Sequence, residues 1–243
     1  MAYNTAKLSL EHMTPAILMT DGYIGQGTEL FRIPKVADMP SITPPLAKAK
    51  DPNYKPYRRD EKTLVRQWAL PGTEGLEHRV GGLEKTDIFG AVSTDPINHD
   101  KMVSNRNEKV QRVADYIPEQ DIIGEDSGDV LVVSWGGTRG QVYDAVKNLQ
   151  KQGKKISLAH FKYIMPLPKN TADIFAKFKK IVVCELNDGQ FANYLRIVHP
   201  QFNYIAYNTV RMYSSELARE ENKVKDLWEY LENIIPYYIK NYA

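Results

Sequence analysis

Apolar and polar positions along the second half of the chain alternate in blocks of strand length and helix length. The β-branched run at 129–136 is followed by an amphipathic stretch at 140–153, in which apolar residues recur every three or four positions until Gly153. Strands that alternate with helices at this spacing predict a mostly parallel sheet with helices on both faces. The predicted strands are 129–136, 154–164, 179–187 and 202–208, and the predicted helices are 140–153, 170–179 (with Asn170 as cap), 190–198 and 214–240.

The first 30 residues show a different pattern. Residues 6–13 have the pattern of the end of a helix, and residues 15–22 have that of a buried strand followed by a turn. A helix and one strand have no neighbours here with which to pair. We therefore expect residues 1–30 to be the last part of a domain whose earlier part is absent.

Residues 31–128 show no sustained hydrophobic period and are rich in proline and charge. Proline stops helices and donates no backbone hydrogen bond, so this segment is not a central strand. We expect an extended linker over 31–128 with one short helix at 98–114, capped by Asn98. Residues 129–243 are then the main domain.

Composition narrows the possible partners. The net charge of +2 over 243 residues favours neither nucleic acid nor an anionic membrane as a partner. No apolar run reaches the roughly 18 residues of a spanning helix. The single cysteine, Cys184, excludes an internal disulfide and a thiolate-only cluster held by this chain alone, and it favours a cytoplasmic location.

A glycine turn at 136–140 follows the first predicted strand, as in dinucleotide-binding folds. Its spacing departs from G-x-G-x-x-G, and the next strand ends near His160 and Lys162 where an acid would bind a ribose. The sequence therefore favours a turn that serves strand-to-helix packing over a cofactor site. A nucleotide-binding α/β protein remains an alternative, with Arg139 as a possible contact to an anion.

Three further features are candidates for chemistry. Glu185 ends a strand, where it fits an acid–base role, a cap on the helix that begins near Gly189, or an interface pair. Cys184 lies in an apolar run, which favours a buried thiol. The glycine-rich loop at 71–85 carries His78, which can change charge near neutral pH, and Arg79, a planar donor for carboxylate or phosphate.

Several of these stretches resemble one known family. The segments MTPAILMTDGYIGQG, RIPKVAD, LPGTEGLEHRVGGLEK, STDPINHDKMVSNRNEKV and CELNDGQ occur in the order found in the alpha subunit of 2-oxoacid:ferredoxin oxidoreductases, especially the 2-oxoglutarate type. The resemblance runs from about residue 5 to about residue 218. It implies that residues 1–30 are the remnant of a thiamine pyrophosphate pyrimidine-binding domain and that 129–243 resemble the transketolase C-terminal domain.

The resemblance implies oxidative decarboxylation of a 2-oxoacid, 2-oxoglutarate first, to its acyl-CoA, with electrons passed to ferredoxin. In this family the complex uses thiamine pyrophosphate, magnesium and an iron–sulfur cluster, and its partners are a beta subunit, ferredoxin and coenzyme A. The Tyr-Pro-x-Thr-Pro stretch and the activating glutamate of the family have no counterpart here. We therefore expect a fragment or split-gene product that is inactive alone and binds no cofactor or metal by itself.

We therefore predict no catalytic residue in this chain, only residues near the subunit interface or the active-site cleft. A non-catalytic assembly module of a thiamine-dependent complex is the alternative function, and a thiamine dehydrogenase that passes acyl groups to lipoamide is a related one. The interface or cleft candidates are Asp21, Gly22, Tyr23, Glu77, His78, Arg79, Glu185 and Asn187.

Overall fold

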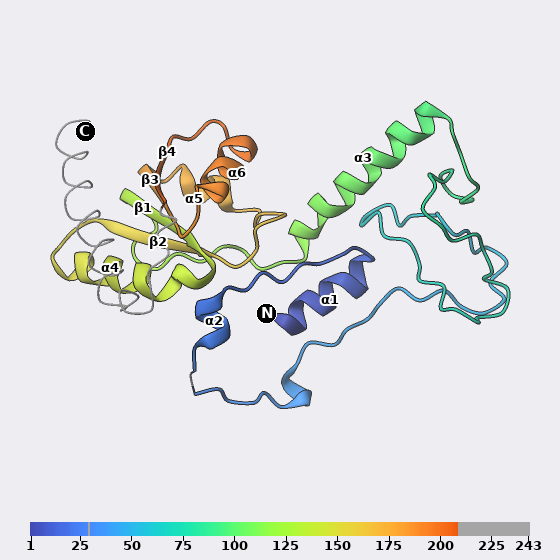
Figure 1. Ribbon diagram of the computed structural model, residues 1–243, viewed down its shortest axis with the longest axis horizontal. Coiled ribbons are helices and arrows are strands. Elements are labelled where there is room, and N and C mark those ends of the chain that lie inside the picture. Colours follow the sequence, from blue (N-terminus) through green and yellow to red (C-terminus); the bar gives the residue numbers. More distant parts are fainter. Residues whose placement is uncertain (29, 209–243) are drawn as a thin grey trace. The chain divides into compact units, whose positions relative to one another are not determined.

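The computed structural model describes residues 1–28 and 30–208, which fall into two compact units (Figure 1). We call the first the loop unit, made of residues 1–19 and 28–117. The second, made of residues 20–27 and 118 onwards, is the sheet unit. The helix predicted at 214–240 lies outside the described residues.

The sheet unit is built on four parallel strands in the order β2-β1-β3-β4. All three pairings are parallel, and Val130 of β1, for example, pairs with Ile156 of β2 and Lys180 of β3. The prediction of a parallel sheet is therefore confirmed. The strands are β1 (Gly128–Trp135), β2 (Ile156–Phe161), β3 (Phe178–Glu185) and β4 (Tyr204–Asn208).

Helices cover both faces of this sheet (Figure 1). Alternate residues of β1 face opposite sides: Val130 and Val132 pack with α4, and Leu131 and Val133 pack with α5 and α6. The predicted apolar stripe of α4 is buried as expected. The helices are α4 (Arg139–Lys151), which follows a 3₁₀ turn (Gly136–Thr138), α5 (Thr171–Phe175) and α6 (Gln190–Val198).

Asn170 occupies the N-cap position of α5, but its side chain makes no capping bond. Instead, its amide pairs with the backbone of Gln120, accepting from the N–H at 2.8 Å and donating to the carbonyl at 3.0 Å. The predicted cap is therefore right in position and wrong in its hydrogen bond, because the segment that leads into the sheet competes for the side chain.

The loop unit has little regular structure apart from α1 (Ala2–His12) and α3 (Pro96–Arg112), with 3₁₀ turns at Val36–Asp38 and Val113–Asp115. Both helices confirm predictions from the sequence. The expected cap, Asn98, is wrong: the side chain of Asp95 accepts from the N–H groups of Ile97 and Asn98 at 3.1 and 3.3 Å. Pro96 suits the first helical position, so the helix begins there.

The buried strand predicted at 15–22 is also wrong. Residues 15–20 form neither helix nor strand, and Ile17 and Met19 are 85% and 54% exposed. A short helix, α2 (Gly22–Gln26), follows. A strand needs a hydrogen-bonded neighbour, and none of the described strands offers one to this segment. No helix among the described residues is long and apolar enough to cross a bilayer.

Candidate functional site

The end of β3 holds a carboxylate that the fold uses as a helix cap. Glu185 is 2% exposed, and its two oxygens accept from the backbone N–H groups of Phe191 and Ala192, both at 2.8 Å. The indole N–H of Trp135, at the end of β1, donates to it at 3.1 Å. Three donors thus hold the carboxylate at the N-terminus of α6, where the helix dipole favours negative charge.

Asn187 supports the same helix end. Its side-chain oxygen accepts from the N–H groups of Gly189 and Gln190 at 2.8 and 3.3 Å. Gly189 has a φ of 81°, a left-handed conformation that glycine adopts without strain. The capping interpretation of Glu185 is therefore confirmed, and both polar residues at the end of this strand serve the strand-to-helix turn.

The glycine turn after β1 is occupied by a side chain from the same unit. A methyl group built on Gly137 would clash with the carboxylate of Asp21, so only glycine allows this close approach. Asp21 also accepts from the backbone N–H of Ile24 at 2.9 Å, which starts α2. Gly22 opens that helix and has open space around it.

The carboxylate of Asp21 disfavours the binding of another anion at this glycine turn. Dinucleotide sites place a pyrophosphate at such a turn, close to the backbone and to a helix N-terminus. The carboxylate of Asp21 already lies against Gly137, and like charges would repel. Thiamine pyrophosphate fails the same test, and the described residues contain no group of three His, Cys, Asp or Glu side chains that could hold its magnesium.

The partly buried His160 and the buried Ser134 form a polar pair near the ends of β2 and β1. The serine Oγ lies 2.8 Å from His160 Nδ1. Burial, reinforced by the positive charges of Arg139 and Lys162, lowers the pKa of His160 to about 4, so the ring is neutral at pH 7. Ser134 is fully buried and cannot meet a substrate. Cys184 is also buried, which agrees with an inert thiol.

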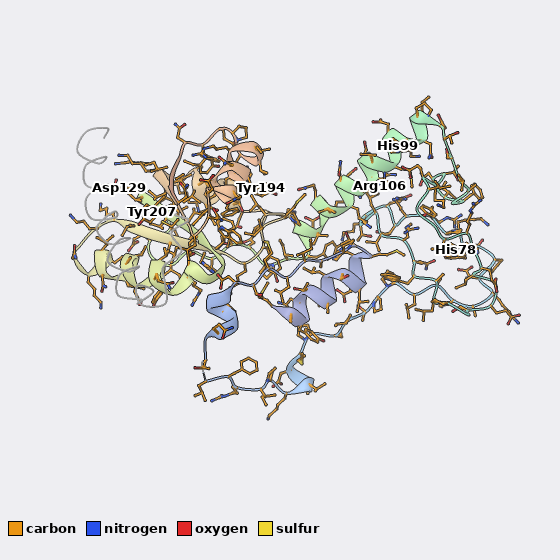
Figure 2. The ribbon with its side chains drawn as sticks, viewed as in Figure 1. His78, His99, Arg106, Asp129, Tyr194 and Tyr207 are labelled. Atoms are coloured by element: carbon orange, nitrogen blue, oxygen red, sulfur yellow. The ribbon has the colours of Figure 1, made fainter. Side chains whose placement is uncertain are left out.

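The glycine-rich loop belongs to the loop unit. Figure 2 labels His78 in this loop. Glu77 and Arg79 are exposed, whereas the ring of His78 is partly buried, with Nδ1 2.9 Å from the carbonyl of Leu76 and the ring beside that of Tyr54. The loop therefore fixes one of its three candidate side chains against its own backbone. It leaves the two charged ones free to meet another molecule.

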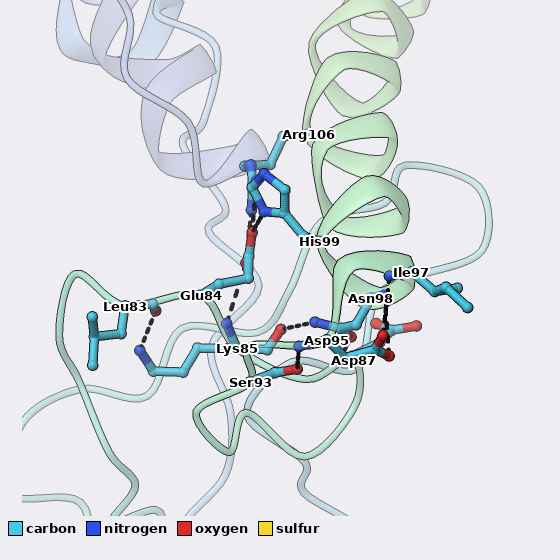
Figure 3. Close-up of polar contacts among 10 residues, drawn as sticks. All are labelled: Leu83, Glu84, Lys85, Asp87, Ser93, Asp95, Ile97, Asn98, His99 and Arg106. Carbon is cyan, nitrogen blue, oxygen red and sulfur yellow. Dashed lines mark hydrogen bonds and ion pairs between the residues drawn. The ribbon is translucent and has the colours of Figure 1, made fainter.

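A polar network ties the following segment to α3 (Figure 3). The carboxylate of Glu84 accepts two bonds from Arg106, at 3.2 and 3.1 Å, and lies 2.7 Å from Nδ1 of His99. These bonds lower the pKa of Glu84 to about 2, with the bond from Arg106 as the largest cause. Asn98 reinforces the link by donating to the carbonyl of Lys85 at 2.9 Å.

Lys85 itself is 2% exposed, and its ammonium donates to the carbonyls of Gly81 and Leu83 at 3.1 and 2.5 Å. We did not predict this network from the sequence. His99 and Arg106 are seven residues apart, hence on one face of a helix, and that spacing was the available signal. A buried lysine satisfied by backbone carbonyls leaves no signal in a sequence.

The structure thus divides the candidate residues between two places. The sheet unit contains Asp21, Gly22, Glu185 and Asn187. The side chains of Asp21, Glu185 and Asn187 accept hydrogen bonds from backbone N–H groups where helices begin. The segment 77–79 lies in the loop unit. The side chain of Tyr23 is outside the described part of the chain.

Comparisons with known proteins agree on one family. Residues 128–214 match the family model for pyruvate:ferredoxin oxidoreductase core domain II. The 2-oxoglutarate oxidoreductase subunit KorA of Mycobacterium tuberculosis is 39% identical over 197 residues, which are 80% of this chain and 30% of the relative. The alpha subunit of 2-oxoacid:ferredoxin oxidoreductase 2 of Aeropyrum pernix is 25% identical over 94% of this chain and 36% of its own length.

A solved structure gives the same result. The 2-oxoglutarate:ferredoxin oxidoreductase of Magnetococcus marinus aligns with a TM-score of 0.65 and 28% identity, over 81% of this chain and 34% of the other. The chain therefore spans about a third of the length of these relatives. These matches identify the chain as a portion of an alpha subunit of the 2-oxoacid:ferredoxin oxidoreductase family, with core domain II at residues 128–214.

Proposed function

We propose that the chain works as part of a complex that oxidatively decarboxylates 2-oxoglutarate to its acyl-CoA and passes the electrons to ferredoxin. The observation that carries this proposal is the 39% identity over 197 residues to a 2-oxoglutarate oxidoreductase subunit. The parallel sheet with helices on both faces gives the chain a rigid platform of the same fold. We propose a cytoplasmic location, which suits the single buried thiol.

We further propose the following division of the chain. Residues 1–30 complete a thiamine pyrophosphate pyrimidine-binding domain, residues 31–128 connect it, and residues 129–243 form a transketolase C-terminal-like domain. The exposed apolar side chains of Ile17 and Met19 support the first assignment, because they offer apolar surface that another part of a larger domain could cover.

The cofactors belong, in this proposal, to the partner polypeptides. Thiamine pyrophosphate supplies the carbanion chemistry, and magnesium and an iron–sulfur cluster complete the complex. In this chain, Asp21 fills the glycine turn and Glu185 caps α6, so neither carboxylate is available as an acid or base. We propose that the chain alone is inactive and orients its partners, a beta subunit first among them.

The loop at 77–79 is the proposed contact to a partner subunit near the cleft. Glu77 and Arg79 are exposed, and the network at Glu84 fixes the end of their loop on α3. A charged pair on a pinned loop binds with less loss of conformational entropy than one on a free loop. Asp21, Gly22 and Tyr23, together with Asn187 at the start of α6, remain the sheet unit's own candidates for an interface or cleft contact.

The test is to produce the chain together with a beta subunit and the part of the alpha subunit that this chain does not span. We expect reduction of viologen that depends on both 2-oxoglutarate and coenzyme A. Arg79→Ala should lower turnover or co-purification about tenfold or more, as for a central interface arginine. The matched control is Arg58→Ala, an exposed arginine of the same unit. Unchanged activity and co-purification in Arg79→Ala would remove the interface role.

A non-catalytic assembly module is the second candidate. It is favoured by the structural use of the polar side chains at the sheet edge, where Glu185, Asn187 and His160 all bind within the unit. In that case the reconstituted complex would form and stay inactive with 2-oxoglutarate. Restored viologen reduction decides for the first candidate.

A further inference from the structure

Four positively charged side chains gather on one part of the loop unit. Arg59 and Arg66 are opposite each other across an antiparallel bridge, in a hairpin that is closed by a bond from Asp60 N–H to Val65 carbonyl at 2.9 Å. Arg106 and Lys109 come from α3. We call Arg59, Arg66, Arg106 and Lys109 the basic cluster. Like charges directly opposite in a strand pair are destabilising unless something compensates them.

The acids nearby do not balance this charge. Asp87 lies 3.6 Å from Arg59, but it is closer to Lys101, at 2.8 Å. Glu84 is shared between Arg106 and His99. Within residues 1–28 and 30–208, the ion pairs include none for Arg66 or Lys109.

The positive side chains of the cluster also influence one another. Burial first, and then the positive charges of Arg66, Arg59 and Arg106, lower the pKa of Lys109 to about 8. The ammonium nevertheless stays charged at pH 7 in most molecules, and it donates to the carbonyl of Met13 at 2.7 Å. An anion beside Lys109 would relieve this repulsion.

The guanidinium groups hold spare donors. Arg59 donates from Nη1 to the carbonyl of Tyr57 at 3.3 Å, while its buried Nε has no acceptor among the described residues. Arg66 makes one long bond, at 3.4 Å to the carbonyl of Pro56, and lies 4.2 Å from the centre of the Tyr57 ring. A buried N–H without an acceptor is costly, so the observation calls for a further partner.

We infer that the basic cluster binds the phosphoryl group of a small phosphorylated ligand. A phosphoryl group carries close to two negative charges and three acceptor oxygens, which fits several cations at once better than one carboxylate does. Arginine presents its N–H groups in a planar fork that matches this geometry. Arg66 and Arg106 are partly or largely exposed, so the ligand can approach from solvent. This inference is independent of the proposed reaction.

The test is calorimetric titration of the 243-residue chain with inorganic pyrophosphate. We expect saturable binding at a single site. Arg66→Gln should weaken it about tenfold, because a charge-assisted pair of bonds is lost. Arg59→Gln should weaken it similarly. The matched control, Arg58→Gln, removes the same charge from an exposed neighbour and should change the dissociation constant less than twofold.

Two further measurements test the same site, one of thermal stability and one of ligand selectivity. At one pyrophosphate concentration, the melting temperature of the unmodified chain should rise more than that of Arg66→Gln, which keeps the test valid if Arg59→Gln fails to fold. Citrate, a carboxylate of comparable charge, should bind more weakly than pyrophosphate. The inference is overturned if no saturable binding is found, if Arg58→Gln weakens binding as much as Arg66→Gln, or if citrate binds more tightly.

Discussion

Different interactions stabilise the interior of each of the two units. The sheet unit has two clusters of buried apolar residues, one on each face, that include Leu131, Val132 and Phe175. The loop unit buries few apolar side chains, among them Leu76 and Met102, and its loops are fixed by hydrogen bonds between side chains and backbone. The buried apolar residues recur along the sequence with the period of their helix or strand. The residues joined by these hydrogen bonds follow no regular spacing in the sequence.

The difference also concerns energy. Burying a leucine or phenylalanine side chain contributes roughly 1.5–3 kcal/mol, whereas an exposed ion pair contributes about 0–1 kcal/mol. We therefore expect the sheet unit to be the more stable part and the loop unit to open locally first. If this is right, removing a polar group should lower the free energy of unfolding most where the group is buried in the sheet unit.

The largest effect is expected for Glu185→Ala. The change leaves the N–H groups of Phe191 and Ala192 and the indole of Trp135 without their acceptor. We expect the free energy of unfolding of the sheet unit to fall by about 3 kcal/mol, measured by urea denaturation. The control, Asp126→Ala, changes an exposed side chain of the same unit and should cost less than about 0.5 kcal/mol. Equal losses in both variants would refute the capping role.

A smaller loss is expected for Gly137→Ala, because the new methyl group would meet the carboxylate of Asp21. The segment that carries α2 must shift, at a cost of about 1–3 kcal/mol by thermal unfolding. Gly140→Ala is the matched control, since a methyl group there has open space. The double variant with Asp21→Ala should recover most of the loss, and failure to recover would show that Asp21 is not the obstacle.

The smallest effect is expected in the loop unit, for Glu84→Gln. Because the folded pKa of Glu84 is about 2, below its ordinary value of 4.5, its contribution is complete above pH 4.5 and is lost as the pH falls through about 2. Its partners are largely exposed, so we expect only about 1 kcal/mol at pH 7.

Hydrogen exchange of the α3 amides would measure this effect. The difference between Glu84→Gln and the unmodified chain should shrink between pH 5 and pH 2, within about the window of the two pKa values. Glu61→Gln, at an exposed position of the same unit, should show no such trend. A difference that stays constant with pH would contradict the ion-pair explanation.

Much of the sheet unit was predictable. The strands, the amphipathic stripe of α4 and the cap at Glu185 follow from hydrophobic period and from the position of a carboxylate before a helix. The buried strand at 15–22 was predicted wrongly, because an apolar run indicates burial only when another strand is present to pair with it. The cap of α3 was predicted wrongly because Asn98 is engaged by residues 85 and 87 of a distant loop.

The sequence by itself determined the parallel α/β sheet, because apolar side chains spaced at two or about 3.6 residues have to be buried on one side of each element. It also determined the family, through motifs that keep their order along the chain. Only the tertiary structure decided that Asp21 fills the glycine turn, that Glu84 joins its loop to α3, and that Arg59 and Arg66 lie opposite each other. These contacts join residues that are distant in sequence or lie in loops. Hydrogen bonds and charge interactions depend on distance in space, and the hydrophobic period along the chain carries no information about that distance.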